Sequence, residues 1–226
     1  MKLYITPERK DFMSSILTRN AVRQVLEMAV STGADFAEVY AEHTKSNRMT
    51  MIDGKVETIV DNFLSGAGIR VCKGLKSVYA CTGDLSLSGL LKCAANAAQA
   101  IASGSASREI VLTERIFGDI HPVKIVPGTA PNARKADIIR TSYAAAREYH
   151  EDISQVESNL IDVDHEILIA NSDGLFTGDR QVRTRLFTSA VASKNGENQA
   201  GSCSPGRRMG LEMFDTIDPA AVGREA

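Results

Sequence analysis

The side chains that could do chemistry in this chain include four histidines. Two of them precede a glutamate, at His150-Glu151 and His165-Glu166. A zincin helix carries two histidines on one face and a glutamate beside the first, but neither pair has a second histidine at that spacing, and His43 and His121 have no acidic or cysteine neighbour at ligand spacing. Both pairs fall where the pattern predicts the end of an element. We therefore interpret them as solvated turn residues, and the sequence predicts no catalytic and no metal-binding residue.

Three arginines follow one another closely, at Arg180, Arg183 and Arg185. In a strand, Arg183 and Arg185 would share a face. Such a pair could bind a peptide carboxylate, a phosphate or an acidic partner. The alternatives are a solvated sheet face or a sheet edge protected against aggregation. These alternatives are favoured, because aspartates and glutamates elsewhere balance the charge, and the substrate-binding residues stay unknown.

Two further patterns fail as chemical motifs. Gly66-Ala67-Gly68-Ile69-Arg70 superficially suggests a phosphate loop, but no Lys-Ser/Thr follows and no helix begins there, so a buried strand is the better interpretation. The glycines within it suggest a bulge or a close backbone approach. The cysteines at 72, 81, 93 and 203 form no C-x-x-C pair, and we expect them to be reduced and buried.

The composition is that of an ordinary globular protein, with 43% hydrophobic and 24% charged residues among 226. A net charge of −2 and an aromatic content of 5% give no indication of nucleic-acid binding. Residues 1–15 look like a loose leader without an apolar core, and the longest aliphatic run is too short to span a membrane. These features predict a cytoplasmic protein with no nucleic-acid and no membrane partner.

An internal duplication organises the chain. Asp53-Gly54 corresponds to Asp173-Gly174, and Lys73-Gly74 corresponds to Asn195-Gly196. We predict a first α+β repeat over 1–103, a linker over 104–131, and a second repeat with the start of a truncated downstream region over 132–226. Segregated helices and antiparallel hairpins make the fold class α+β, with duplicated helix-plus-hairpin units forming an antiparallel sheet covered by helices.

The elements of each repeat follow from periodicity and turn signals. Helices are expected near 17–29 and 86–103, from Asn132 as a cap, and from Asp218-Pro219. In the first repeat, strands are expected at 36–42, then through Ile52 after a turn at 45–47, and at 56–60, 66–72 and 75–81. In the second repeat, strands are expected near 153–162 and 166–170 around a turn at 163–165, and near 180–193 and 197–203.

Three short segments carry a resemblance: 33–40 (Gly-Ala-Asp-Phe-Ala-Glu-Val-Tyr), 53–57 (Asp-Gly-Lys-Val-Glu) and 66–71 (Gly-Ala-Gly-Ile-Arg-Val). Together they resemble the N-terminal domain of the TldD/PmbA family. The segment Asn171-Ser172-Asp173-Gly174 and the arginine-bearing strand resemble the mid-region of that family. The resemblance covers about 17–215, and its Glu-Val-Tyr strand and Asp53 hairpin look more like the TldD branch than the PmbA branch.

The resemblance implies a cytoplasmic zinc metallopeptidase that acts on unfolded or small peptides. It implies that a TldD-like subunit pairs with a PmbA-like subunit, with a homo-oligomer as the alternative, and that zinc is held by an H-E-x-x-x-H helix. That motif is not present in these 226 residues, so no catalytic or metal residue carries over, and the chain alone is expected to be inactive. Its expected role is to form part of the wall of the catalytic chamber, to bind the partner subunit, and to hold an extended peptide along the edge of a sheet. The rival interpretation is a non-catalytic PmbA-like or scaffold subunit. The family has also been linked to DNA gyrase, which the net charge does not support.

Overall fold

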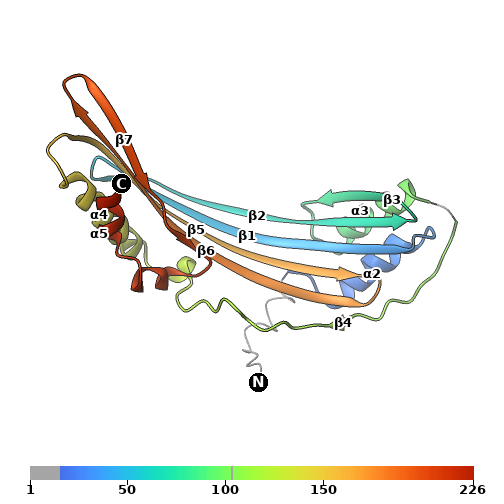
Figure 1. Ribbon diagram of the computed structural model, residues 1–226. Helices are drawn as coiled ribbons and strands as arrows, with labels where there is room; N and C mark the ends of the chain where they lie inside the picture. Colours follow the sequence, from blue (N-terminus) through green and yellow to red (C-terminus); the bar gives the residue numbers. More distant parts are fainter. Residues whose placement is uncertain (1–15, 103) are drawn as a thin grey trace. The chain divides into compact units, whose positions relative to one another are not determined.

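A computed structural model of the chain describes residues 16–102 and 104–226; the predicted leader lies outside these residues. The described strands form an eight-stranded sheet in the order β3-β2-β1-β5-β6-β4, with β7 and β8 also paired to β6 (Figure 1). The strands are β1 (Phe36–Ile52), β2 (Lys55–Lys73), β3 (Lys76–Thr82), β4 (Thr113–Glu114), β5 (Ile153–Asn171), β6 (Leu175–Lys194), β7 (Glu197–Cys203) and β8 (Gly206–Arg207). The helices are α2 (Arg19–Val30), α3 (Leu87–Ala100), α4 (Asn132–Arg147) and α5 (Pro219–Glu225), with 3-10 turns η1 (Pro127–Thr129) and η2 (Leu211–Asp215).

The predicted α+β class is confirmed, and so are the hairpin turns at Asp53-Gly54 and Asn195-Gly196. Asp53 and Gly54 have φ values of 47° and 78°, and Asn195 and Gly196 have 51° and 85°. Both central residues of a type I′ turn need positive φ, which Asn, Asp and Gly tolerate best. β2 pairs antiparallel with β3, starting with Lys73 opposite Lys76. β6 pairs antiparallel with β7, starting with Lys194 opposite Glu197.

Two turns predicted inside these strands are wrong. Residues 45–47 lie within β1, and residues 163–165 lie within β5. The segments 56–60 and 66–72 likewise belong to one strand, β2. Polar residues suggested turns at these places, but a polar side chain can stay in a strand when a neighbouring element supplies a partner. Asn47 and His165 both have such partners, described below.

The helices begin close to the expected positions. Thr18, Ser86 and Asp218 each accept a hydrogen bond from a backbone N–H in the first turn of α2, α3 and α5. The prediction for α4 is wrong by one position, because Asn132 is its first residue and Pro131 occupies the cap without a side-chain hydrogen bond. No helix in the described ranges is long and apolar enough to cross a membrane.

The described chain divides into two compact units, each built from three segments. Unit 1 comprises residues 16–44, 64–119 and 165–180, and unit 2 comprises 45–63, 120–164 and 181–226. β1, β2, β5 and β6 each pass from one unit into the other. The division into 1–103, 104–131 and 132–226 follows the order of the repeats along the sequence, and it stays a prediction.

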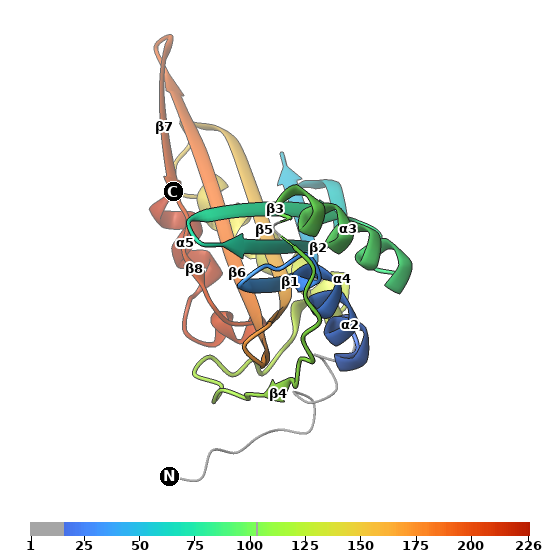
Figure 2. The ribbon, with the colours of Figure 1, turned by 90° about the vertical axis from the view of Figure 1, so that its right-hand side faces the viewer.

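In unit 1, α2 and α3 lie on one face of the strands (Figure 2). β1 turns its alanines and Val39 toward these helices, as the alternation of strand residues predicts. The buried core here includes Leu26, Ile69, Leu90 and Leu168. The small residues of α3 allow a close approach to the sheet, because alanine adds little width to a helix face.

In unit 2, α4 and α5 pack against each other and against the strands (Figure 1). The core contains Met49 and Met51 of β1, Ile139 of α4, Leu160 of β5 and Leu186 of β6. On all three strands, these buried side chains therefore lie on the sheet face that packs against α4. This arrangement positions the pocket described next.

Candidate functional site

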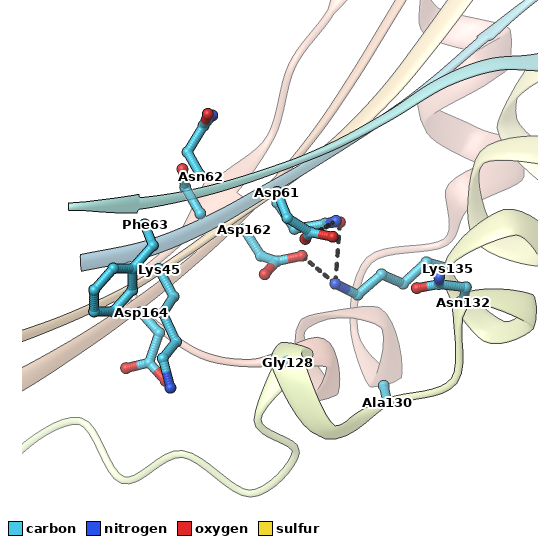
Figure 3. Close-up of a pocket in the computed structure, with 12 residues that line it drawn as sticks. Lys45, Asp61, Asn62, Phe63, Gly128, Ala130, Asn132, Lys135, Asp162 and Asp164 are labelled. Carbon is cyan, nitrogen blue, oxygen red and sulfur yellow. Dashed lines mark hydrogen bonds and ion pairs between the residues drawn. The ribbon is translucent and has the colours of Figure 1, made fainter. Parts of the chain in front are cut away.

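A pocket of about 410 Å³ lies in unit 2, where α4 begins over β1, β2 and β5 (Figure 3). Phe63 of β2 and Lys45 of β1 lie at one side, and Gly128 and Ala130, which flank the end of η1, lie at another. Three aspartates and two lysines line it: Asp61, Asp162, Asp164, Lys45 and Lys135. The pocket is therefore polar and carries charges of both signs.

A buried lysine organises the charges of this pocket. Lys135 reaches from α4 to β5, where its Nζ atom donates a hydrogen bond of 2.6 Å to Asp162 Oδ2 (Figure 3). The same Nζ atom donates to Asn47 Oδ1 at 3.1 Å, and Asn47 Nδ2 donates to Asp61 Oδ1 at 2.7 Å. The side chains of Lys135 and Asp162 are only 3% and 7% exposed. One network thus joins α4 to β1, β2 and β5.

The sequence contains a signal for this network that periodicity analysis missed. Lys135 lies three, four and seven positions before Ile138, Ile139 and Ser142, so it occupies the buried face of α4. A lysine in an apolar stripe needs a charged partner when it is buried. The sequence did not reveal that partner, because Asp162 lies 27 residues away in a segment that we expected to precede a turn.

Burial raises the pKa of Asp162 above its ordinary value. The hydrogen bond from Lys135 acts in the opposite direction, while the nearby carboxylates of Asp61 and Asp164 raise the pKa further. Asp162 is therefore easier to protonate than an exposed aspartate. The ammonium of Lys135 has three donors, of which two have these partners.

A second buried charge holds the chain near this pocket. Glu212 of η2 accepts hydrogen bonds from the backbone N–H groups of Lys124, Ile125 and Gly210. Burial raises its pKa, but the backbone hydrogen bonds together outweigh burial, and the pKa lies below its ordinary value. The segment 124–125 leads directly into η1, so this carboxylate fixes the chain that lines the pocket.

His165 lies in the middle of β5, so its predicted position at an element end is wrong. Its Nε2 atom is 3.0 Å from Glu42 Oε2 and 3.4 Å from the Tyr40 hydroxyl, and Tyr40 donates to Glu42 at 2.8 Å. Burial, together with the hydrogen bond and charge of Glu42, raises the pKa of Tyr40 to about 12. Tyr40 and Glu42 line a small hollow of about 170 Å³ in unit 1, beside Gly68 and Tyr79.

The other histidines are not among the residues that line either of these two hollows. His150 follows α4, is exposed, and accepts a hydrogen bond at Nδ1 from the backbone N–H of Asp152. His43 is half-buried on β1, and His121 is exposed between β4 and η1. The described residues thus bring none of these histidines into the pocket of Figure 3.

The four cysteines are free thiols. Cys93 is buried, Cys72 and Cys203 are half-buried, and Cys81 is exposed. The expectation that all four are buried is therefore confirmed only for Cys93, and it is wrong for Cys81, which alternates with the core-facing Ala80 of β3 and so points to the opposite face. The expected strand at 66–70 is confirmed within β2, and the ring of Tyr79 lies close against the backbone of Gly68.

The three arginines of the sequence separate in the structure. The Arg180 Nε atom lies 3.7 Å from Glu166 Oε1 in unit 1. Arg183 and Arg185 belong to unit 2 and are exposed on the same face of β6. No cluster of three or more histidine, cysteine, aspartate or glutamate side chains within 16–102 and 104–226 has the arrangement of a metal site. The residues described here therefore do not fit a metal centre.

Comparisons with known proteins place both halves of the chain. Residues 37–101 match the family model of PmbA/TldA metallopeptidase domain 1, and residues 126–226 match the model of the central domain. A metalloprotease TldD homolog of Haemophilus influenzae is 23% identical over 90% of this chain and 43% of its own length. A metalloprotease of Methanothermobacter thermautotrophicus is 23% identical over 95% of this chain and 44% of its own length. The chain thus spans less than half the length of these relatives.

Solved structures share the fold. A Thermotoga maritima protein, named for a proposed role as a modulator of a DNA gyrase, superposes with a TM-score of 0.72 at 16% identity, over 92% of this chain and 46% of that one. TldE from Thermococcus kodakarensis superposes with a TM-score of 0.65 at 15% identity, over 91% and 46%. With domain 1 and the central domain matched in order along the sequence, the chain belongs to the PmbA/TldD metallopeptidase family.

Proposed function

We propose that this chain is the peptide-binding and partner-binding part of a cytoplasmic, TldD-like zinc metallopeptidase. The observation that carries the proposal is the ordered match to domain 1 and the central domain of the family, over 37–101 and 126–226. The relatives named as metalloproteases are more than twice as long as the stretch that matches. In the whole enzyme, zinc bound outside the residues described here would supply a water activated for attack on a peptide bond.

An open strand edge supports peptide binding. Within the described residues, β3 pairs with β2 only over residues 67–73. Every residue from Lys55 to Leu64 is exposed, including the large side chains of Ile59 and Phe63. An extended peptide could add to this edge through main-chain hydrogen bonds, which do not depend on peptide sequence. This mode suits an enzyme whose substrates are unfolded.

The pocket of Figure 3 adjoins that edge, because Asp61, Asn62 and Phe63 belong to both. A peptide side chain could enter the pocket from the edge. The carboxylates there accept hydrogen bonds, and Lys135 lies at the pocket with its ammonium turned toward Asp162. The pocket would therefore hold a polar or basic side chain better than a large aliphatic one.

The proposal is tested with two forms of the protein: this chain, and this chain with whatever coding sequence follows Ala226 in its gene. We expect stoichiometric zinc and peptide cleavage in the longer form only. Metal content is measured by atomic emission and cleavage with a quenched fluorescent peptide. Phe63→Ala in the longer form should raise KM several-fold more than it changes kcat, because Phe63 lies at the proposed peptide edge.

Two results would contradict the proposal. A longer form without zinc and without cleavage, alone or mixed with a PmbA-like partner, would favour a non-catalytic PmbA-like or scaffold subunit. Salt-dependent DNA binding by the chain would instead favour a nucleic-acid role. The fold similarity to TldE makes a two-chain assembly the arrangement to test first.

A further inference from the structure

A groove of about 390 Å³ in unit 2 is lined by arginines and aliphatic side chains. We call it the arginine groove; it is defined by Arg183, Arg185, Arg207, Arg208, Ile161 and Val163. β6 and β8 bring these arginines together, because Thr184 pairs with Arg207 and Arg185 with Gly206. The sequence pattern predicted only that Arg183 and Arg185 share a strand face, and it gave no sign that Arg207 and Arg208 lie beside them.

The groove lies on the sheet face that α4 does not cover. Val182, Thr184 and Leu186 of β6 are buried, and Leu186 packs in the core with Ile139 of α4. Arg183 and Arg185 alternate with them and therefore point to the opposite face. On β5, Ile161 and Val163 alternate in the same way with Leu160 and Asp162, and Asp162 faces Lys135 of α4.

Within the described ranges, three of these arginines donate side-chain hydrogen bonds to neutral acceptors. Arg183 donates to Gln181 Oε1 at 2.7 Å, Arg185 donates to Ser204 Oγ at 2.6 Å, and Arg207 donates to its neighbour Gly206 O at 2.9 Å. No aspartate or glutamate is among the residues that line the groove. Each guanidinium carries five donors, so these three arginines keep donors and a positive charge that can serve a ligand.

We propose that the arginine groove binds the C-terminal residue of a peptide, with its carboxylate on Arg183 and Arg185 and its side chain against Ile161 and Val163. The planar fork of a guanidinium matches a carboxylate in two parallel hydrogen bonds. The two aliphatic side chains are half-buried on the sheet face opposite α4, and the stems of the arginines can cover them. The groove therefore complements a group that is anionic at one end and apolar at the other.

Other anions fit the groove less well. Inorganic phosphate would use the charge but leave the aliphatic side chains without a partner. A nucleic acid needs a long basic surface, whereas the chain has a net charge of −2. The inference goes beyond the proposed function, because it places a peptide terminus on β5, β6 and β8 rather than along β2. It does not require metal or cleavage, so its failure and that of the proposed function are distinguishable.

The test measures binding of a fluorescent hexapeptide ending in leucine to the full 226-residue chain by anisotropy. The same peptide with a C-terminal amide is the ligand control. The groove variant is Arg183→Gln with Arg185→Gln. The matched control is Arg140→Gln with Arg224→Gln, which removes the same charge from exposed arginines of α4 and α5. Circular dichroism melts check that each variant is folded.

We expect the free acid to bind about tenfold more tightly than the amide, since a charge-assisted hydrogen bond contributes more than a neutral one. The preference should disappear in the groove variant and remain in the matched control. A peptide ending in serine should bind several-fold more weakly than the leucine peptide. Equal binding of acid and amide, an unchanged preference in the groove variant, or displacement by phosphate or single-stranded DNA but not by N-acetyl-leucine would each overturn the proposal.

Discussion

Lys135 and Glu212 are both buried charges, but the structure compensates them in different ways. Lys135 has an opposite charge, Asp162, at 2.6 Å, whereas Glu212 has backbone N–H donors from three residues. A buried ion pair is costly when one partner is removed, because the other charge remains desolvated. A carboxylate held by backbone donors instead fixes the local course of the chain. The two residues therefore predict different responses to mutation and to pH.

Lys135→Met is expected to destabilise the chain by about 3–5 kcal/mol at neutral pH, because it leaves Asp162 buried without its cation. Urea unfolding followed by circular dichroism measures the change. The loss should shrink at acidic pH, since burial already raises the pKa of Asp162 and a protonated carboxyl needs no counter-charge. Lys92→Met, on the exposed surface of α3, is the control, and an equal loss for both variants would contradict the prediction.

Glu212→Gln is expected to cost about 1–3 kcal/mol at pH 7, the scale of hydrogen bonds to a buried charged group. The pKa of Glu212 lies below its ordinary value of 4.5 in the folded state. Its carboxylate therefore contributes full stability above pH 4.5, and that contribution is lost as the pH falls through the folded pKa. Urea unfolding at several pH values should show wild type and variant converging below pH 4.5, while exposed Glu151→Gln stays near wild type throughout.

At the scale of elements, the close approach of α5 to α4 depends on one glycine. A Cβ atom at Gly223 would lie 2.0 Å from the carbonyl oxygen of Ser142 and 3.0 Å from the amide nitrogen of Ala146. These are backbone atoms, which cannot relieve the clash by a change of rotamer as a flexible side chain can. α5 would have to move away from α4 to accept even a methyl group.

Gly223→Ala is therefore expected to destabilise the chain by about 1–3 kcal/mol, although alanine favours helix more than glycine does. Thermal unfolding followed by circular dichroism measures the effect. Gly83→Ala is the matched control, because a Cβ atom there meets no atom within 4 Å. If Gly223→Ala raised the melting temperature, helix propensity would outweigh the contact, and the packing argument would be wrong.

At the scale of the whole molecule, the predicted repeats and the compact units divide the chain differently. The helices α2 and α3, which we assigned to the first repeat, belong to unit 1, and α4 and α5, which we assigned to the second, belong to unit 2. In the described part of the chain, β1, β2, β5 and β6 each contribute residues to both units. These continuous strands link the two units covalently and provide a path for cooperativity.

Leu26→Ala in unit 1 and Leu186→Ala in unit 2 are each expected to cost about 2–5 kcal/mol, because both side chains are fully buried. Each should shift one common unfolding transition, since neither unit can lose its strands without disturbing the other. Hydrogen exchange by mass spectrometry during urea unfolding reports on both units. Loss of protection in α2 and α3 alone after Leu26→Ala, with α4 unchanged, would show that the units unfold independently.

The sequence by itself determined the helices near 17–29 and 86–103, the hairpin turns at Asp53-Gly54 and Asn195-Gly196, the α+β class and the family. These depend on local rules: positive φ at turns, capping side chains, and the periods of helices and strands. The tertiary structure decided that Asn47, Asp162 and His165 lie inside long strands, and that Lys135 meets Asp162. It also decided that Arg207 and Arg208 join Arg183 and Arg185 in one groove. These outcomes depend on partners distant in sequence, because a polar residue in a strand is stable only where another element supplies its hydrogen bond.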